Sequence, residues 1–351
     1  MPDIKTMLVI GATGVIGRRA IRHLDAAEGW RAIGVSRRKP DDATGAAHVS
    51  VDLMEKADCK AKLGALEGVT HLLYAAYTDR PSWAAQCAPN ALMLENVLDG
   101  LDGASGDLAR VVLMQGTKYY GSHLGPFKTP ALESDPRHMP PNFYFNQQDL
   151  LAERQKGRDW TWTCLRPHTV CGFAVGMPMN LVAVIGVYAA ISKALGLPLR
   201  FPGTEACYRA VFQVTDADLL ARATLWAADA PGAANEAFNI TNGDFFRWQH
   251  LWPGFADFFG MDYAPPQAIR LAEFMADKEP VWRALVKKHG LMATPFAEAA
   301  HWPFGDYIFN QHWDIMSDTL KARQAGFPDC TPSEAMFRRL FAELRERRFI
   351  P

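Results

Sequence analysis

The chain has 351 residues, with 37 basic and 38 acidic side chains and a formal net charge of −1. Because the charges are balanced and mixed along the sequence, they exclude a strongly basic surface for nucleic acid or for an anionic membrane, and the predicted partner is a small molecule. The six cysteines form no CxxC pair and no Cys/His pair at ligand spacing, so we predict free thiols and no metal site.

No apolar segment approaches the about 20 residues that a membrane span requires. The longest, residues 181–191, is interpreted as a buried helix. The chain enters a strand almost at once, without the basic and apolar segments of a secretion signal, which predicts a cytoplasmic protein. The sequence leaves the assembly open between a monomer and a homodimer.

Short apolar runs alternate with segments of helical periodicity through the first half of the chain. This alternation predicts an α/β protein with a parallel sheet covered on both faces, as in the doubly wound Rossmann fold. The predicted strands are residues 7–10, 32–35, 49–51, 71–76, 111–114, 162–167 and 236–240, and the predicted helices include residues 15–24 and 91–101.

Aromatic and proline residues become more frequent beyond Cys171, which is typical of a smaller region that covers a substrate. We expect residues 1–170 to form the dinucleotide-binding Rossmann domain, with a returning segment near residues 207–245. Residues 171–206 and 246–351 are expected to form a smaller, mainly helical substrate-binding region. Trp248 and Trp252 are interpreted as core residues.

A glycine-rich turn directly follows the first predicted strand and opens the first predicted helix. In a dinucleotide fold the first glycine allows the tight turn, the second lets the backbone approach the pyrophosphate, and the third allows close helix packing. The helix N-terminus offers free N–H donors to the phosphates. The alternative is a glycine-rich turn without a ligand. The predicted cofactor contacts of this turn are Gly11, Thr13, Gly14, Val15, Ile16 and Gly17.

The second strand ends at Ser36, followed by Arg37 and Arg38, where an NAD-preferring enzyme usually carries an acidic residue. Because arginine grips phosphate through paired N–H donors, these residues predict the 2′-phosphate of NADPH. The alternative is a pair of solvated surface arginines. Asp52 and its neighbour Leu53 follow the third strand and are predicted to contact the adenine, although aspartate is also a common turn residue.

The Tyr-x-x-x-Lys pair of the extended short-chain dehydrogenases is missing. The best candidate tyrosine is Tyr144, and the lysine position is occupied by the uncharged Gln148. Lys118 follows the fifth predicted strand, in the loop that ends at the nicotinamide in this fold, and is the candidate for the missing positive charge.

Several further segments add to these motifs. They are the Arg37-Arg38 pair, the loop Gly116-x-Lys118-x-Tyr120, Pro141-Asn142-Phe143-Tyr144, residues 198–203, 235–239 and 242–252, and the final Ile350-Pro351. On these segments the chain resembles the progesterone 5β-reductase and iridoid synthase-like enone reductases, a branch of the short-chain dehydrogenases. The resemblance covers effectively the whole chain. The chain departs from the family pattern at Tyr119, where histidine is usual, and at Phe145, where a second tyrosine is usual.

The resemblance implies NADPH-dependent 1,4-reduction of an activated alkene in an apolar enone or enal, a class that extends to 3-oxo-Δ4-steroids. Tyr144 and Lys118 match the family's catalytic pair. Tyr144 is expected to donate a hydrogen bond to the developing enolate oxygen, and Lys118 is expected to lower the pKa of that phenol and to add positive potential. The further cofactor contacts that we expect are Ala76, Gln115, Tyr144, Pro167 and Val170.

Two other functions are compatible with the fold. The first is a carbonyl reductase, or an enzyme of the epimerase or dehydratase type, and the absent Tyr-x-x-x-Lys pair counts against it. The second is a non-enzymatic NADP sensor, against which the presence of both Tyr144 and Lys118 counts.

Overall fold

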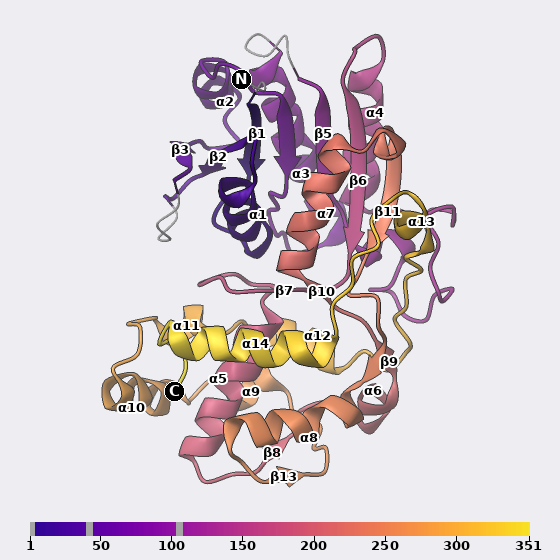
Figure 1. Cartoon of the computed structure of the whole chain (residues 1–351). Coiled ribbons are helices and arrows are strands. Elements are labelled where there is room, and N and C mark those ends of the chain that lie inside the picture. The colour runs from indigo at the N-terminus through magenta and orange to yellow at the C-terminus, as the bar shows by residue number, and fades with distance from the viewer. Residues whose placement is uncertain (1–3, 40–44, 103–107) are drawn as a thin grey trace.

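The computed structural model describes residues 4–39, 45–102 and 108–351. Its centre is a seven-stranded parallel sheet with the strand order β11-β6-β5-β4-β1-β2-β3, which confirms the predicted doubly wound fold (Figure 1). All seven predicted strands are present, and β11 has the predicted bounds. The strands are β1 (Lys5–Ile10), β2 (Trp30–Ser36), β3 (Ala47–Ser50), β4 (His71–Tyr74), β5 (Arg110–Met114), β6 (Thr161–Pro167) and β11 (Glu236–Ile240).

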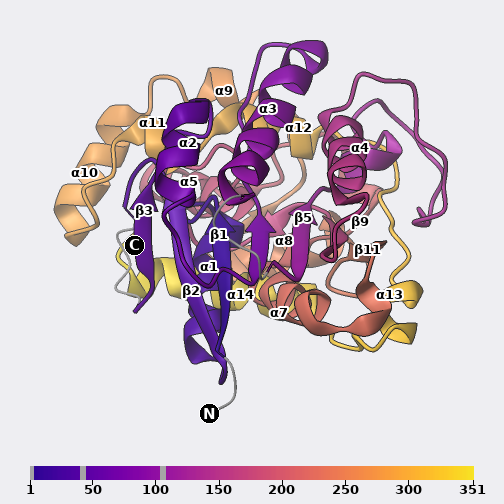
Figure 2. The same ribbon diagram turned by 90° about the horizontal axis from the view of Figure 1, so that it is seen from above.

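Alternate residues of each strand point to opposite faces of the sheet, and both faces are covered (Figure 2). In β1, Met7 and Val9 contribute to one apolar cluster, whereas Leu8 and Ile10 contribute to the other. This burial on both sides explains why the strands are continuously apolar. The first cluster includes α1 (Val15–Ala26) and α7 (Ala217–Asp229), and the second includes α2 (Lys56–Leu63), α3 (Trp83–Leu101) and α4 (Phe143–Gln155).

Helix α3 begins at Trp83, eight residues before the predicted start at Ala91. The hydroxyl oxygen of Ser82 accepts a hydrogen bond from the N–H of Ala85 at 3.2 Å, which caps the helix. Pro89 lies inside the helix, and the buried residues of its first turns, Gln86 and Asn90, are polar, so apolar periodicity does not reveal these turns. The earlier start brings Trp83 to the carboxyl end of the sheet, beside the candidate site.

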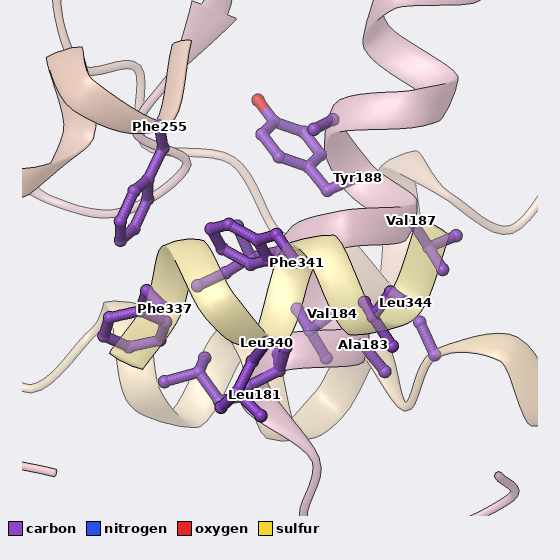
Figure 3. Packing of buried hydrophobic residues seen from close by; sticks show 14 of the residues in the cluster. Leu181, Ala183, Val184, Val187, Tyr188, Phe255, Phe337, Leu340, Phe341 and Leu344 are labelled. Atoms are coloured by element: carbon purple, nitrogen blue, oxygen red, sulfur yellow. The ribbon is translucent and has the colours of Figure 1, made fainter. Parts of the chain in front are cut away.

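The remaining elements form a mainly helical region on the carboxyl side of the sheet (Figure 1). Its centre is α5 (Leu181–Ala194), the predicted buried helix, which packs against α14 (Ser333–Glu346) in Figure 3. Phe255 of α8 (Trp248–Phe259) packs against Phe337 and Phe341 of α14. Trp248 and Trp252 are fully buried, as predicted. In the described ranges, no helix is both long and apolar enough to cross a bilayer.

Shorter elements complete this region and its links to the sheet. The helices are α6 (Glu205–Arg209), α9 (Leu271–Phe274), α10 (Glu279–His289), α11 (Phe296–Ala299), α12 (Trp302–Phe309) and α13 (Leu320–Gln324), with 3-10 turns η1 (Thr117–Tyr120) and η2 (Pro231–Ala233). The paired short strands are β7 (Val170–Cys171) with β10 (Thr215–Asp216), β9 (Val211–Phe212) with β12 (Phe246–Arg247), and β8 (Leu199–Arg200) with β13 (Tyr263–Ala264).

Helix α14 joins the helical region to the sheet region. Its Glu343 carboxylate lies 2.6 Å from the Arg19 guanidinium on α1, and its Arg339 guanidinium lies 2.6 Å from the Asp216 carboxylate. Cys207, Tyr208, Phe212 and Val214 contribute to the helical core, and the chain rejoins the sheet region at β10. Near the C-terminus, Ala322 and Phe327 pack into the core on the α1 and α7 face of the sheet.

Candidate active site

Backbone conformation and close packing require glycine at two of the three glycine positions in the first turn. Gly11 has φ +92°, and a Cβ atom there would lie 2.9 Å from the carbonyl oxygen of Ala75. A Cβ atom on Gly17 would lie only 2.3 Å from the carbonyl oxygen of Gly11. The tight turn and the close approach of α1 to the strand therefore both need glycine, as the sequence predicts.

Gly14 has a different role, because a Cβ atom there would meet only the carbonyl oxygen of Gly11, at an ordinary 3.4 Å. Gly14 is the N-cap of α1, so no side chain caps the helix, and its first turn contains no acidic residue. Val15 and Ile16 begin the helix, after Thr13, whose carbonyl oxygen accepts a hydrogen bond from Arg18. The uncapped N–H groups of the helix N-terminus and the open space at Gly14 fit a pyrophosphate group.

Arg37 and Arg38 are exposed at the carboxyl end of β2, and their backbone is held in place by two hydroxyl groups. Ser36 donates to the carbonyl oxygen of Arg38 at 2.6 Å, and Ser50 donates to that of Arg37 at 2.9 Å. His48, which sequence analysis does not single out, lies with Nε2 3.0 Å from the Ser36 hydroxyl. Burial and the nearby Lys39 lower the pKa of His48. The resulting cationic surface fits a phosphate group.

Asp52 forms a local turn, as the alternative interpretation of this residue expects. Its carboxylate accepts a hydrogen bond from the N–H of Met54 at 3.0 Å, and its own N–H donates to Asp58 at 2.8 Å. The next carbonyl, that of Leu53, accepts from Asn96 at 2.9 Å. Asp52 remains exposed, so its second carboxylate oxygen is open to solvent.

Tyr144 lies in the first turn of α4, at the carboxyl end of the sheet. The side-chain oxygen of Asn142 caps the helix by accepting a hydrogen bond from the Tyr144 N–H at 3.0 Å. The Tyr144 hydroxyl lies against Gly116, where a Cβ atom would be 3.2 Å from it and 3.3 Å from the carbonyl oxygen of Pro167. Gly116 has extended backbone, so the space and not the conformation requires glycine here.

Burial raises the pKa of the Tyr144 phenol well above its usual value, and the nearby Tyr307 raises it further. Lys118 is not among the groups that shift this pKa, so the prediction that it lowers the pKa of Tyr144 is wrong. Withdrawal of the phenol from water is the largest cause of this shift. The phenol therefore keeps its proton at neutral pH and can act as a hydrogen-bond donor.

Lys118 lies in η1, directly after β5. Its main-chain carbonyl oxygen accepts a hydrogen bond from Asn142 at 2.8 Å, so the segments that carry Lys118 and Tyr144 are tied together. The ammonium group lies over two aromatic rings, 5.0 Å from the centroid of Trp83 and 5.3 Å from that of Tyr307. Burial lowers the pKa of Lys118.

Gln148 occupies the position of the missing lysine, and its side chain belongs to a buried network. The Gln148 carbonyl oxygen accepts from Arg166 at 3.4 Å and from the Gln115 amide at 3.3 Å. Gln115 in turn accepts from Arg166 at 2.9 Å and donates to the Tyr144 carbonyl oxygen at 3.2 Å. The positive charge near this position is therefore that of the buried Arg166. The Gln115 amide nitrogen already donates to two groups of the protein.

The two departures from the family pattern are in contact with each other. The rings of Tyr119 and Phe145 pack edge to face with centroids 5.1 Å apart. The Arg166 guanidinium lies 3.4 Å from the centroid of Tyr119, and Arg137 donates a hydrogen bond to the Tyr119 hydroxyl at 3.3 Å. Both residues belong to an apolar cluster against which Tyr144 packs.

The other predicted cofactor contacts lie at the carboxyl ends of the central strands. Ala76 follows β4, Pro167 ends β6 and Val170 opens β7. Thr169, just before Val170, has φ +40°, a conformation that is strained for a β-branched residue. The turn after β6 is therefore held in place by its surroundings. Its His168 is buried, and burial together with Lys118 lowers the pKa of this imidazole to about 3, so it is neutral.

Trp83 and Tyr307 are site residues that sequence analysis does not identify. Trp83 falls before the predicted start of its helix, and Tyr307 lies in α12 of the helical region, far along the chain. No local motif marks either residue. Only their contact with the Lys118 ammonium places them at the site.

Comparisons with known proteins show which family the chain resembles. The PRISE-like Rossmann-fold domain family matches residues 46–351. An (S)-8-oxocitronellyl enol synthase from Nepeta cataria is 36% identical over 341 residues, which cover 91% of this chain and 86% of the relative. A 3-oxo-Delta(4,5)-steroid 5-beta-reductase from Arabidopsis thaliana is 36% identical over 344 residues, with the same coverage.

The chain belongs to the PRISE-like Rossmann-fold domain family. This membership confirms the predicted resemblance. The family match begins at residue 46, so the glycine-rich turn and Arg37-Arg38 lie before it, and their assignment depends on the geometry above.

Solved structures at low identity show the same fold for this PRISE-like chain. UDP-glucose 4-epimerase from Thermotoga maritima has a TM-score of 0.69 at 15% identity, with 97% of this chain and 99% of that chain covered. A short-chain dehydrogenase/reductase superfamily protein from Agrobacterium tumefaciens, solved with bound NAD, has a TM-score of 0.66 at 15% identity, with 97% and 98% covered. These two structures therefore share the Rossmann fold with this chain.

Proposed function

We propose that this PRISE-like chain is an NADPH-dependent reductase that saturates the activated carbon–carbon double bond of an enone or enal. Its relatives are named as an enol synthase and as a 3-oxo-steroid 5β-reductase. The observation that carries the proposal is that Asn142 ties together the two segments that carry Tyr144 and Lys118, and that both side chains lie beside Tyr307.

The reaction requires a donor for the charge that develops on the substrate oxygen. When bound, the nicotinamide would supply a hydride to the β carbon of the substrate, and the electron pair of the double bond would move to give an enolate. Tyr144 donates its hydrogen bond to the enolate oxygen, and its raised pKa keeps that proton in place. Lys118 adds positive potential in a site of low dielectric, where a charge acts strongly. The α carbon then takes a proton from water, which yields the saturated carbonyl compound.

The surroundings of this pair favour an apolar substrate. Tyr77, Phe143 and Tyr144 form a chain of ring contacts, with centroids 5.4 Å and 4.5 Å apart. Trp83 and Tyr307 add further aromatic surface at Lys118. Such a lining suits small cyclic enones, open-chain enals and 3-oxo-Δ4-steroids.

The two regions of the protein, each with its own apolar core, would have different functions. Residues 1–170, with the returning β10, α7 and β11, would bind the nucleotide, and residues 171–206 with 246–351 would cover the substrate. Separate apolar clusters in the sheet region and in the helical region support this division. The Tyr307 ring of the helical region contacts the Lys118 ammonium of the sheet region. The substrate would therefore lie at the boundary between the two regions.

Arg37 and Arg38 would select NADPH over NADH through the 2′-phosphate. Neither guanidinium forms an ion pair with a carboxylate in the part of the chain that the structure describes. Loss of one bidentate arginine should weaken NADPH binding by about 1.5–3 kcal/mol with little effect on NADH. Kinetics of Arg37→Ala and Arg38→Ala with both cofactors test this, and an unchanged preference would refute the assignment.

The activity is tested by following NADPH oxidation with 2-cyclohexen-1-one and identifying the product by mass spectrometry. Cyclohexanone should form, and Tyr144→Phe should lower kcat by about 10²–10³-fold, as expected for loss of an oxyanion donor. Lys118→Ala should also be strongly impaired. Formation of the allylic alcohol would support a carbonyl reductase instead. If a panel of enones caused no NADPH oxidation, the non-enzymatic sensor would be favoured.

A further inference from the structure

The Lys118 ammonium lies over two aromatic rings that come from different regions of the protein. Its Nζ atom is 5.0 Å from the ring centroid of Trp83, the first residue of α3, and 5.3 Å from that of Tyr307 in α12. Both distances are within the range of a cation–π interaction, in which the negative face of the ring attracts the cation. The attraction is largest where the cation is withdrawn from water, as here.

The aromatic rings are not joined by a carboxylate that pairs with the Lys118 ammonium in the described part of the chain. Among the residues that the structure describes, Lys118 forms no ion pair, and the acidic group that acts on its pKa is Asp79. One oxygen of the Asp79 carboxylate already accepts hydrogen bonds from the Tyr77 hydroxyl at 2.7 Å and from the Gln86 amide at 2.9 Å. In the described ranges, no carboxylate therefore forms an ion pair with the Lys118 ammonium.

The other titratable groups near the ammonium are two neutral imidazoles. His123, which follows η1, has its pKa lowered to about 4 by burial, Lys118 and His138. His168, after β6, has its pKa lowered to about 3 by burial and Lys118. Neither can neutralise the lysine. The His123 ring also lies 4.0 Å from that of Trp83, so it supports the indole from the side.

We propose that Trp83 and Tyr307 are positioning residues, an aromatic clamp that holds the Lys118 ammonium charged and desolvated for enolate stabilisation. The identity of that reaction rests on the proposed function. A ring face stabilises a cation without cancelling its charge, whereas a carboxylate at the same place would neutralise the potential that the enolate needs. Because Tyr307 belongs to the helical region, the charge is held in place only when both regions are assembled.

The alternative is that both rings only fill space, and matched variants separate the two roles. Trp83→Leu and Tyr307→Leu keep an apolar group beside the ammonium but remove the ring face. Trp83→Phe and Tyr307→Phe keep a ring face. Trp30→Leu is the matched control, because Lys5 lies 5.2 Å from the Trp30 centroid in a similar pair in the sheet region.

The experiment is a pH titration of Lys118 that needs no turnover. Lysines are reductively methylated with ¹³C-formaldehyde, and the Lys118 resonance is identified by its absence in Lys118→Arg. Each Leu variant should lower the titration midpoint of Lys118 by about half a unit to one unit, and each Phe variant by less. The alkaline limb of kcat/KM for 2-cyclohexen-1-one should move in parallel, and Trp30→Leu should leave the Lys118 midpoint unchanged.

Equal midpoints in the Leu and Phe variants, or a midpoint that rises in both Leu variants, would overturn the clamp. The two positions are independent, so one variant that fails to fold still leaves the other as a test. If wild-type protein reduces no enone while the midpoints shift as expected, the clamp stands and the proposed function fails. If enone is reduced but the midpoints do not shift, the function stands and the clamp fails.

Discussion

The side-chain amide of Asn142 donates a hydrogen bond to the main-chain carbonyl oxygen of Lys118 at 2.8 Å. The oxygen of the same amide accepts from the N–H of Tyr144 at 3.0 Å. One buried side chain therefore sets the start of α4 and the position of η1 together. Asn142 therefore contributes to the relative placement of the two proposed catalytic groups.

Substitution of Asn142 should separate capping from positioning. Asn142→Ser keeps a hydroxyl oxygen that can cap α4 but loses the donor to Lys118, whereas Asn142→Ala loses both. We expect Asn142→Ala to cost about 1 kcal/mol more stability than Asn142→Ser. Both should lower kcat by about 10- to 100-fold, since small displacements at a reacting centre are costly. Urea unfolding and steady-state kinetics measure the two effects, and wild-type kcat in Asn142→Ser would contradict the positioning role.

Gly116→Ala should impair turnover without unfolding the protein. The new methyl group would lie 3.2 Å from the Tyr144 hydroxyl and 3.3 Å from the Pro167 carbonyl oxygen, so the hydroxyl has to shift. The extended backbone at Gly116 accepts alanine. We expect kcat to fall about tenfold or more, with a stability change below about 1 kcal/mol. Gly232→Ala, which meets no atom within 4 Å, is the control and should retain full activity.

Alanine substitution at two glycines of the first turn should affect different properties, stability in one case and NADPH binding in the other. Gly17→Ala places a Cβ atom 2.3 Å from the Gly11 carbonyl oxygen and should destabilise the protein by about 1–3 kcal/mol. Gly14→Ala meets only an ordinary 3.4 Å contact and should fold normally, but it should weaken NADPH binding about tenfold or more. Melting curves with and without NADPH distinguish the two. Unchanged NADPH affinity in Gly14→Ala would argue against a pyrophosphate at this turn.

Stability should fall as the pH drops below 6.5. Burial lowers the pKa of His71 to about 4 in the folded chain, from an ordinary 6.5. Because the unfolded chain takes up the proton first, the stability is complete above pH 6.5, declines between pH 6.5 and 4, and levels off below. This one histidine accounts for about 2 kcal/mol between pH 6.5 and 5. His123 and His168 act in the same direction.

Urea unfolding of the wild type and of His71→Gln at pH 7.5 and at pH 5 measures this effect. The variant should lose less stability than the wild type between the two pH values. A pH dependence that is the same in both proteins would show that His71 does not remain neutral in the fold.

The sequence by itself determines the sheet and the first turn, because these depend on local regularities. Continuous burial on both faces makes the strands uniformly apolar, and the close contacts of Gly11 and Gly17 permit no other residue. The family segments likewise identify Tyr144 and Lys118 as the candidate pair. The late start predicted for α3 shows the limit of this approach, because the buried residues of its first turns are polar and give no apolar period.

Only the tertiary structure decides what surrounds the candidate pair. The direction of the Tyr144 pKa shift depends on how much water the packed site excludes. The Gln148 side chain accepts a hydrogen bond from the buried Arg166 of β6, a contact that forms only in the folded chain. The contact of Lys118 with Tyr307 joins residues that are far apart in the chain. Periodicity and spacing describe neighbours along the sequence, whereas charge, dielectric and ring contacts at this site come from segments that meet only after folding.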